Sequence, residues 1–219
     1  MKCMDDFDGI MNWENYFKNS ETFKNNKPFK FAFVEDVFNK EFYENLYETY
    51  PKYDESWKHY QDYSRSSRNM ELEDPKQFLE KENPKFSSTW NKFFRYLATK
   101  DFVENMSKFT GIEFKKVVRV GFINSHKGDF SLPHIDGYTN ADGSPYSRIN
   151  VLMYFNKGWQ KGDPGGTYIC KNEDESSLIF EPYNLDNSLV CFEETPDSWH
   201  GSRFIIKDVR RQAVSFALI

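Results

Sequence analysis

The chain has 219 residues, and its 29 Lys and Arg against 34 Asp and Glu give a formal net charge of −5. The length fits one domain, and the 38% hydrophobic content, rich in Phe and Tyr, can fill a substantial core. The acidic balance argues against general nucleic-acid binding. Purely apolar runs such as Val151–Phe155 are far shorter than the ~20 residues that cross a bilayer. Neither nucleic acid nor a membrane is therefore expected as a partner.

Cysteine usage and the N-terminal stretch indicate a reducing compartment. Cys3, Cys170 and Cys191 are widely spaced and odd in number, so neither a disulfide framework nor a CxxC metal site is indicated. The acidic stretch MKCMDDFDGIMNWENYF lacks the apolar segment of a secretory signal. A cytoplasmic location is therefore expected.

In chain order, the first clear pattern is a strand followed by a helix. Phe29–Phe33 reads as a short strand. Aromatic residues and Leu46 at helical spacing predict a helix from about Asn39, the expected N-cap, to Tyr50, and Pro51 ends it.

Helical periodicity continues after a polar segment. Residues 52–88 are polar and interrupted by two prolines, which predicts loops with one short helix around Gln77. Two helical stretches follow, one over Trp90–Leu97 and one from Asp101 to Gly111, where glycine suits the position after a helix.

After Gly111 the hydrophobic period shortens to that of strands between turn residues. Many short strands without long linkers are typical of a closed or double-sheet core such as a jelly roll. The predicted fold class is mainly β with N-terminal helices (α+β), in one domain over 1–219, with a mostly helical support at 1–111 and a β core at 112–219. The expected strands are Lys115–Ile123, Leu132–Asp136, Arg148–Phe155, Thr167–Cys170, Leu178–Phe180, Ser188–Phe192, Trp199–Ile205 and Gln212–Leu218.

The last strand shows how the core is expected to be buried. Ala213 and Ser215 share one face, and Val214, Phe216 and Leu218 share the other. We expect the small, polar-tolerant face to line a barrel interior and the bulky face to lie under the N-terminal helices.

A candidate metal site follows from the histidines. His134 and Asp136 are two residues apart in a strand-like run, so their side chains point to the same face. His200 lies beside a later strand that can return next to the first. Two histidines and one carboxylate on one face form the ligand set of non-haem Fe(II) oxygenases. Taken alone, a HxD pair is weak evidence, because such pairs also cap turns or lie on the surface.

The wider pattern resembles a known family. The segments HIDGYTNADGSPYSRINVLMYFNKGWQKGDPGGTYI, SLVCFEETPDSWHGSRF and RRQAVSF are similar to the Fe(II)/2-oxoglutarate-dependent dioxygenases. The resemblance is to the prolyl 4-hydroxylase-like branch, which includes the hypoxia-inducible-factor prolyl hydroxylases. It covers roughly residues 112–219 and implies a double-stranded β-helix (jelly-roll) core with helices packed on the major sheet.

The resemblance also implies roles for single residues. His134, Asp136 and His200 would ligate Fe(II) and act as the catalytic set. Arg211 would hold the distal carboxylate of 2-oxoglutarate, with Arg210 as the competing choice.

Further positions are implied with less detail. Tyr154 would hydrogen-bond the same carboxylate as Arg211, and Ser215 would share the inward face of the last strand. Asn124 stands ten residues before His134, where many family members have a tyrosine that contacts the cofactor. Substrate contacts are expected from Tyr138, Tyr146 and Arg148, in and beside the loop that follows the HxD pair.

The implied activity is hydroxylation of an unactivated C–H bond, with 2-oxoglutarate and O2 converted to succinate and CO2. Cofactors would be Fe(II), 2-oxoglutarate as cosubstrate and O2, with ascorbate as reductant. The preferred hypothesis is a prolyl-hydroxylase-like enzyme that acts on a protein or peptide. The alternatives are a small-molecule hydroxylase and a non-catalytic cupin-like ligand-binding module. The sequence leaves the oligomeric state open.

Overall fold

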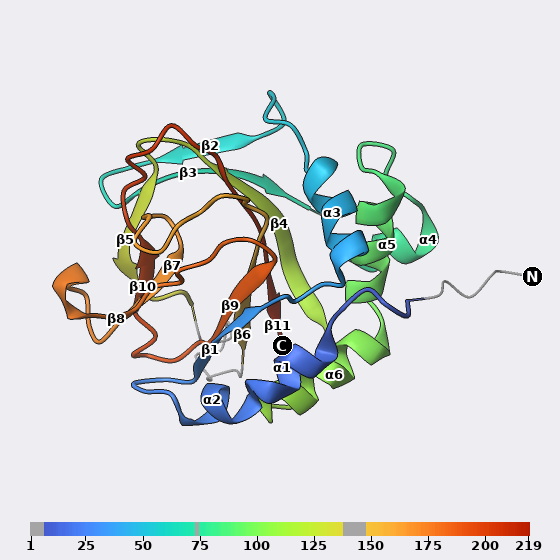
Figure 1. Ribbon diagram of the computed structural model, residues 1–219, viewed down its shortest axis with the longest axis horizontal. Helices are drawn as coiled ribbons and strands as arrows, with labels where there is room; N and C mark the ends of the chain where they lie inside the picture. The colour runs from blue at the N-terminus through green and yellow to red at the C-terminus, as the bar shows by residue number, and fades with distance from the viewer. Residues whose placement is uncertain (1–6, 73–74, 138–147) are drawn as a thin grey trace, which may run out of the picture.

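Strand pairing folds the chain into two facing layers of β-structure. The structure, a computed structural model, describes residues 7–72, 75–137 and 148–219. Within this part of the chain, a larger layer has the order β1-β9-β6-β11-β4-β3, with β2 paired to β3 at its edge, and a smaller layer has the order β5-β10-β7-β8. Strand β3 pairs with both β4 and β5 and so joins the two layers (Figure 1). The strands are β1 (Phe31–Glu35), β2 (Lys58–Gln61), β3 (Arg65–Glu71), β4 (Val117–Ser125), β5 (Phe130–His134), β6 (Ile149–Tyr154), β7 (Thr167–Cys170), β8 (Leu178–Phe180), β9 (Ser188–Glu193), β10 (His200–Ser202) and β11 (Arg211–Leu218).

The helices cover the outer face of the larger layer (Figure 1). Ser87 and Thr99 cap the two longest by accepting hydrogen bonds from backbone N–H groups, and Gly111 ends the last one in the left-handed conformation. Between helices and sheet lies a large aromatic core, in which Trp90 packs edge-on against Phe122 of β4. The helices are α1 (Trp13–Lys18), α2 (Ser20–Asn25), α3 (Lys40–Glu48), α4 (Gln77–Glu80), α5 (Ser88–Leu97), α6 (Lys100–Thr110) and the 3-10 turn η1 (Glu175–Ser177).

Strand β11 divides the interior as predicted. Val214, Phe216 and Leu218 belong to the core beneath the helices. Ala213 packs in a second core cluster between the two layers, and Ser215 lines the cavity there. The fold class expected from the sequence is confirmed, with a double-stranded β-helix and helices on its larger sheet.

The prediction for residues 52–88 was wrong in one respect. This segment contains the hairpin of β2 and β3 in addition to α4, which lies at the predicted place. All four residues of β2 are exposed, and β3 is polar along most of its length, so hydrophobic alternation does not mark these strands. Strands β1, β2 and β3 all precede residue 111 and nevertheless extend the β-sheet.

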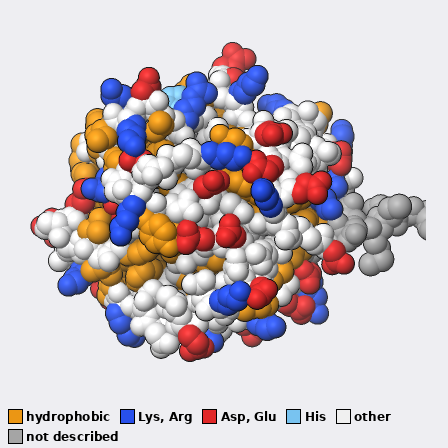
Figure 2. All heavy atoms as spheres, in the orientation of Figure 1, with side chains coloured by type: hydrophobic (Ala, Val, Ile, Leu, Met, Phe, Trp, Pro, Cys, Tyr) orange, Lys and Arg blue, Asp and Glu red, His pale blue; other side chains and the backbone are white. Residues whose placement is uncertain are grey.

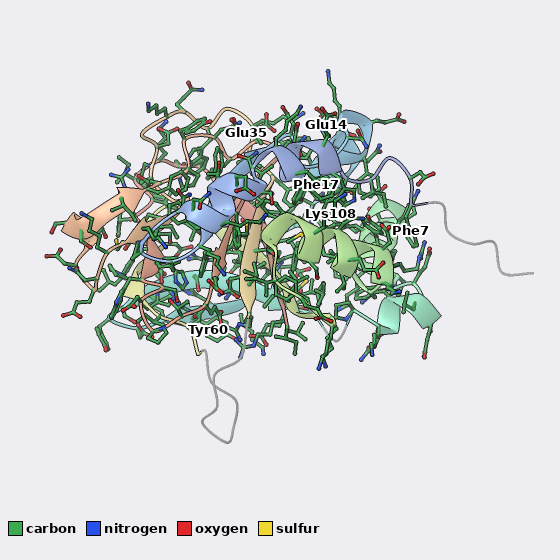
Figure 3. All side chains as sticks on the ribbon, turned by 90° about the horizontal axis from the view of Figure 1, so that it is seen from below. Phe7, Glu14, Phe17, Glu35, Tyr60 and Lys108 are labelled. Atoms are coloured by element: carbon green, nitrogen blue, oxygen red, sulfur yellow. The ribbon has the colours of Figure 1, made fainter. Side chains whose placement is uncertain are left out.

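The visible surface mixes both signs of charge without a broad patch of either (Figure 2). On the helical side, Lys108 of α6 lies over the ring of Phe17 of α1, 4.4 Å from its centroid (Figure 3). Among the described residues, no helix has the length and apolar character needed to cross a membrane.

Candidate active site

His134 and His200 meet through strand pairing. They are direct register partners across the antiparallel strands β5 and β10, and their ring centroids lie 4.4 Å apart. His200 is also paired with Ile169 of β7, so its strand is held on both sides. The two imidazoles are therefore positioned by backbone hydrogen bonding on rigid strands.

Backbone carbonyls orient both rings in the same way. Nδ1 of His134 lies 2.8 Å from the carbonyl oxygen of Leu132, and Nδ1 of His200 lies 2.9 Å from that of Ser198. Each Nδ1–H can donate to its carbonyl, which directs the Nε2 lone pair of each ring to the cavity. The lone pair of His134 accepts a hydrogen bond from Nη2 of Arg65 there, which a bound metal ion would replace. Protein partners on the second nitrogen commonly orient metal-binding histidines in this way.

Asp136 completes the group from just beyond the end of β5. Its carboxylate oxygens lie 3.8 Å from Nε2 of His134 and 3.7 Å from Nε2 of His200. Asn150 of β6 donates a hydrogen bond of 2.8 Å to Oδ2 of Asp136 and fixes the carboxylate. All three donor atoms lie within 4.8 Å of one another.

Protonation of these residues suits a metal ion. Burial lowers the pKa of His200 to about 4, with a further contribution from neighbouring His134. Burial likewise lowers the pKa of His134. Burial opposes ionisation of Asp136, but the two histidines, Arg148 and Arg65 together hold its pKa below the usual value. At neutral pH the site thus offers two neutral imidazoles and one carboxylate, the ligand set of a facial Fe(II) site.

A cavity of about 240 Å³ between the two layers contains this group. Arg211 of β11 reaches the same cavity and is only 4% exposed. Its Nη2 donates to Oγ1 of Thr167 at 3.2 Å and lies 3.5 Å from the hydroxyl of Tyr154. Among the described residues, its Nε has no hydrogen-bond partner and its guanidinium has no carboxylate within 4.0 Å.

Burial of a cation without a counter-ion is unfavourable in free energy, so the Arg211 guanidinium is suited to bind an anionic ligand. The carboxylate of 2-oxoglutarate matches the planar guanidinium fork. Tyr154 accepts a hydrogen bond from the backbone N–H of Thr167 at 2.9 Å, which leaves its own hydroxyl proton free to be donated to a ligand. Ser215 lines the cavity on the same face of β11. The residues present therefore fit both the metal and the cosubstrate.

The structure distinguishes the two arginines that the sequence offered for binding 2-oxoglutarate. Arg210 is exposed and does not line the cavity, whereas Arg211 is buried within it.

Asn124 is also buried, but its neighbours Ile123 and Ser125 line the cavity while Asn124 does not. Because side chains alternate along β4, Asn124 lies on the face of Phe122, towards the helices. The expected cofactor contact of Asn124 is not supported by this geometry.

The expected substrate residues have different outcomes. Arg148 is buried in an ion pair with Glu194 and does not line the cavity. It influences the site through its charge, which helps to lower the pKa of Asp136. Tyr138 and Tyr146 lie outside the described residues.

Sequence reasoning missed several polar cavity residues, among them Arg65, Asn150 and Thr167. Arg65 lies on β3, which was read as loop, and its Nη2 is 2.8 Å from Nε2 of His134. Asn150 and Thr167 lie on predicted strands. Nothing in the local sequence shows whether a polar residue in a strand supports a binding site or only stabilises the fold.

Comparisons with known proteins agree with this geometry. Residues 120–217 match the family model of the 2OG-Fe(II) oxygenase superfamily. No curated protein matches the chain. Similar solved structures include a Pseudomonas putida prolyl-4-hydroxylase, at 12% identity, covering 91% of this chain and 97% of that one, with a TM-score of 0.63.

Two further structures share the fold. A Trichoplax adhaerens prolyl hydroxylase, in complex with a hypoxia-inducible-factor peptide fragment, is 14% identical over 94% of this chain and 88% of that one, with a TM-score of 0.59. A viral collagen prolyl hydroxylase from Paramecium Bursaria Chlorella virus-1, in its 2-oxoglutarate complex, is 13% identical over 86% of this chain and 94% of that one, with a TM-score of 0.52.

A double-stranded β-helix with two histidines and a carboxylate facing one cavity is the architecture of the non-haem iron oxygenase class. The β core matches the model of the 2OG-Fe(II) oxygenase superfamily, and the whole fold is similar to those of solved prolyl hydroxylases, in agreement with the resemblance seen in the sequence.

Proposed function

We propose that this protein is an Fe(II)- and 2-oxoglutarate-dependent dioxygenase that hydroxylates an unactivated C–H bond. The observation that supports it most is the pairing of two features in one cavity. The group of His134, Asp136 and His200 can hold a metal ion, and the buried guanidinium of Arg211 has no carboxylate partner among the described residues.

Each side chain has a defined task in this proposal. The Nε2 atoms of His134 and His200 and the carboxylate of Asp136 would hold Fe(II). Arg211, oriented by Thr167, would bind the distal carboxylate of 2-oxoglutarate and so direct the other end of the molecule to the metal. Bound Fe(II) supplies the redox chemistry, by which substrate C–H, 2-oxoglutarate and O2 become hydroxylated product, succinate and CO2.

The preferred substrate is a protein or peptide residue, with prolyl hydroxylation as the specific case. This part is supported by fold similarity to prolyl hydroxylases, one of which is in complex with a peptide. Hydroxylation of a small molecule is the alternative within the same chemistry. Ascorbate as reductant and a cytoplasmic location complete the proposal, and the free, buried Cys170 and Cys191 agree with a reducing compartment.

The test is consumption of 2-oxoglutarate and formation of succinate by purified protein with added Fe(II) and ascorbate, without a prime substrate. We expect metal-dependent succinate release that chelation abolishes and that Arg211→Ala strongly reduces. A protein that binds metal but neither binds nor consumes 2-oxoglutarate would instead be the non-catalytic, cupin-like module. Products heavier by one oxygen atom, found by mass spectrometry of candidate peptides and cell extracts, would then identify the substrate.

A further inference from the structure

The cavity carries more positive charge than the proposed metal and cosubstrate use. Its described lining contains three arginines, Arg65, Arg119 and Arg211, but only one carboxylate, that of Asp136. If the proposed function holds, the charges of Fe(II), dianionic 2-oxoglutarate, Asp136 and Arg211 cancel one another. Arg65 and Arg119 then remain as two cations facing the space where a substrate must lie.

Arg65 places its charge beside the metal group. It pairs with Ser131 across β3 and β5, and its Nη2 lies 2.8 Å from Nε2 of His134. Its charge acts on both His134 and Asp136, whose pKa values it helps to lower. Within the part of the chain that the structure describes, no carboxylate lies within 4.0 Å of its guanidinium.

Arg119 enters the cavity through an irregularity of β4. Ser215 pairs with Gly121 but Ala217 pairs with Val118, so two residues of β4 oppose one residue of β11. Arg119 lies in this bulge with φ +55°, a left-handed conformation that costs a non-glycine residue free energy. Bulges often redirect a side chain next to an active site. Arg119 is exposed and lines the cavity. No described carboxylate lies within 4.0 Å of its guanidinium, and Glu194 is the described carboxyl group on which its charge acts.

The two cations are too far apart to clamp one small group. Leu72 donates its backbone N–H to the carbonyl of Val120, so Arg119 lies level with the end of β3, seven residues beyond Arg65. At ~3.3 Å per residue, their backbones are separated by up to about 23 Å along the strand. Each arginine therefore makes its own contact.

We propose that the substrate is an acidic molecule with at least two carboxylates or comparable anionic groups. Arg65 binds one of them beside the metal group, close to the C–H bond that reacts, and Arg119 binds the second farther along the cavity. Charge-assisted hydrogen bonds of guanidinium with carboxylate provide both affinity and orientation. Arg65 and Arg119 thus act as specificity-determining residues, separate from the cosubstrate contact of Arg211.

The test uses full-length protein loaded with Zn(II) and 2-oxoglutarate, which binds without turnover. Isothermal titration compares a peptide of alternating Glu and Gly with its Gln counterpart, and 1,2,3-propanetricarboxylate with its triamide. We expect at least one acidic probe to bind tenfold or more tightly than its neutral counterpart. Acidic peptide binding alone assigns a peptide substrate, and binding of the small tricarboxylate assigns a small-molecule acid.

Variants then locate the contacts. Arg65→Gln and Arg119→Gln should each weaken acidic-probe binding about tenfold, and the two losses should multiply in the double variant because the sites are separate. Arg119→Gly serves as a second variant, since glycine adopts the left-handed conformation without strain but lacks the cation. Arg210→Gln is the matched control, an exposed arginine outside the cavity whose loss should change nothing.

Two results would overturn the inference. Equal binding of acidic and neutral probes by 2-oxoglutarate-loaded protein would show that the arginines do not select acids. A loss of 2-oxoglutarate affinity in Arg65→Gln as large as the loss of probe affinity would assign Arg65 to the cosubstrate. Failure of the unmodified Zn(II) protein to bind 2-oxoglutarate is a different outcome, because it removes the proposed function itself.

Discussion

His134 and His200 are register partners on neighbouring antiparallel strands, and backbone carbonyls hold the Nδ1 atom of each ring. The metal-facing nitrogens are therefore oriented before any ion binds. Preorganisation of this kind lowers the cost of metal binding, because little side-chain freedom remains to be lost.

Removing any one ligand should abolish metal binding while the chain still folds. We expect His134→Ala, Asp136→Ala and His200→Ala each to weaken Fe(II) affinity by more than the 10–100-fold typical of losing a group behind the ligands. Anaerobic Fe(II) titration measures the loss, and thermal unfolding checks the fold. His59→Gln is the control, because His59 does not line the cavity. Wild-type affinity in any ligand variant would remove that residue from the metal set.

The two neighbouring arginines should behave very differently. Arg211→Ala should raise the 2-oxoglutarate requirement by about 10–150-fold, since a charge-assisted contact in a dry cavity contributes roughly 1.5–3 kcal/mol. Arg210→Ala should have little effect, because its side chain is exposed. Titration of both variants with 2-oxoglutarate decides between them. A larger defect in Arg210→Ala would mean that the inward face of β11 is assigned to the wrong residues.

Gly201 occupies a place where no side chain fits. A Cβ there would lie 2.5 Å from the backbone oxygen of Ser131 and 2.5 Å from the hydroxyl of Tyr168. We therefore expect Gly201→Ala to lower the free energy of unfolding by ~1–3 kcal/mol and to disturb the pairing of His200. Gly137→Ala is the control, because an added Cβ there meets no described atom within 4 Å. Urea unfolding compares the two, and equal stability would show that β10 and β5 separate without cost.

Metal-free protein should lose stability in mild acid because of His200. Burial lowers its pKa in the folded protein to about 4, whereas an unfolded histidine has a pKa near 6.5. As the pH falls, His200 is protonated in the unfolded chain before it is protonated in the folded protein. The stabilisation of the folded state that is present above pH 6.5 is therefore lost progressively towards pH 4. The free energy of unfolding should fall by ~3 kcal/mol over this range.

The comparison that isolates this effect is His200→Gln. Chelator-treated protein should show a shallower fall in unfolding free energy between pH 7 and pH 4 when the histidine is replaced. Parallel curves for the two proteins would indicate that His200 titrates normally in the fold.

Much of the β core could be predicted from local patterns. Each of the eight strands expected after Gly111 has a counterpart, with boundaries that shift by a few residues. The two faces of β11 followed from period-two alternation of small and bulky residues, because opposite faces of that strand contact different layers. The spacing of His134 and Asp136 carried the metal hypothesis for the same reason.

Polar strands and exact register were beyond local reasoning. The hairpin of β2 and β3 is held by pairing to β4 and β5 rather than by its own hydrophobic pattern, so Arg65 was missed. The expectation for Asn124 depended on the family's spacing, and a displacement of one residue along a strand moves a side chain to the opposite face.

Local patterns along the chain predict which chemical groups are available: two histidines, a carboxylate and an arginine in or beside the predicted strands. Which of these groups meet depends on how the strands pair and pack in the folded chain. Pairing of β5 with β10 joins His134 to His200, and the cavity between the layers adds Thr167, Arg65 and Arg119. The physical reason is that side-chain direction along a strand is a local property, whereas register between distant strands is set by the packing of the whole sheet.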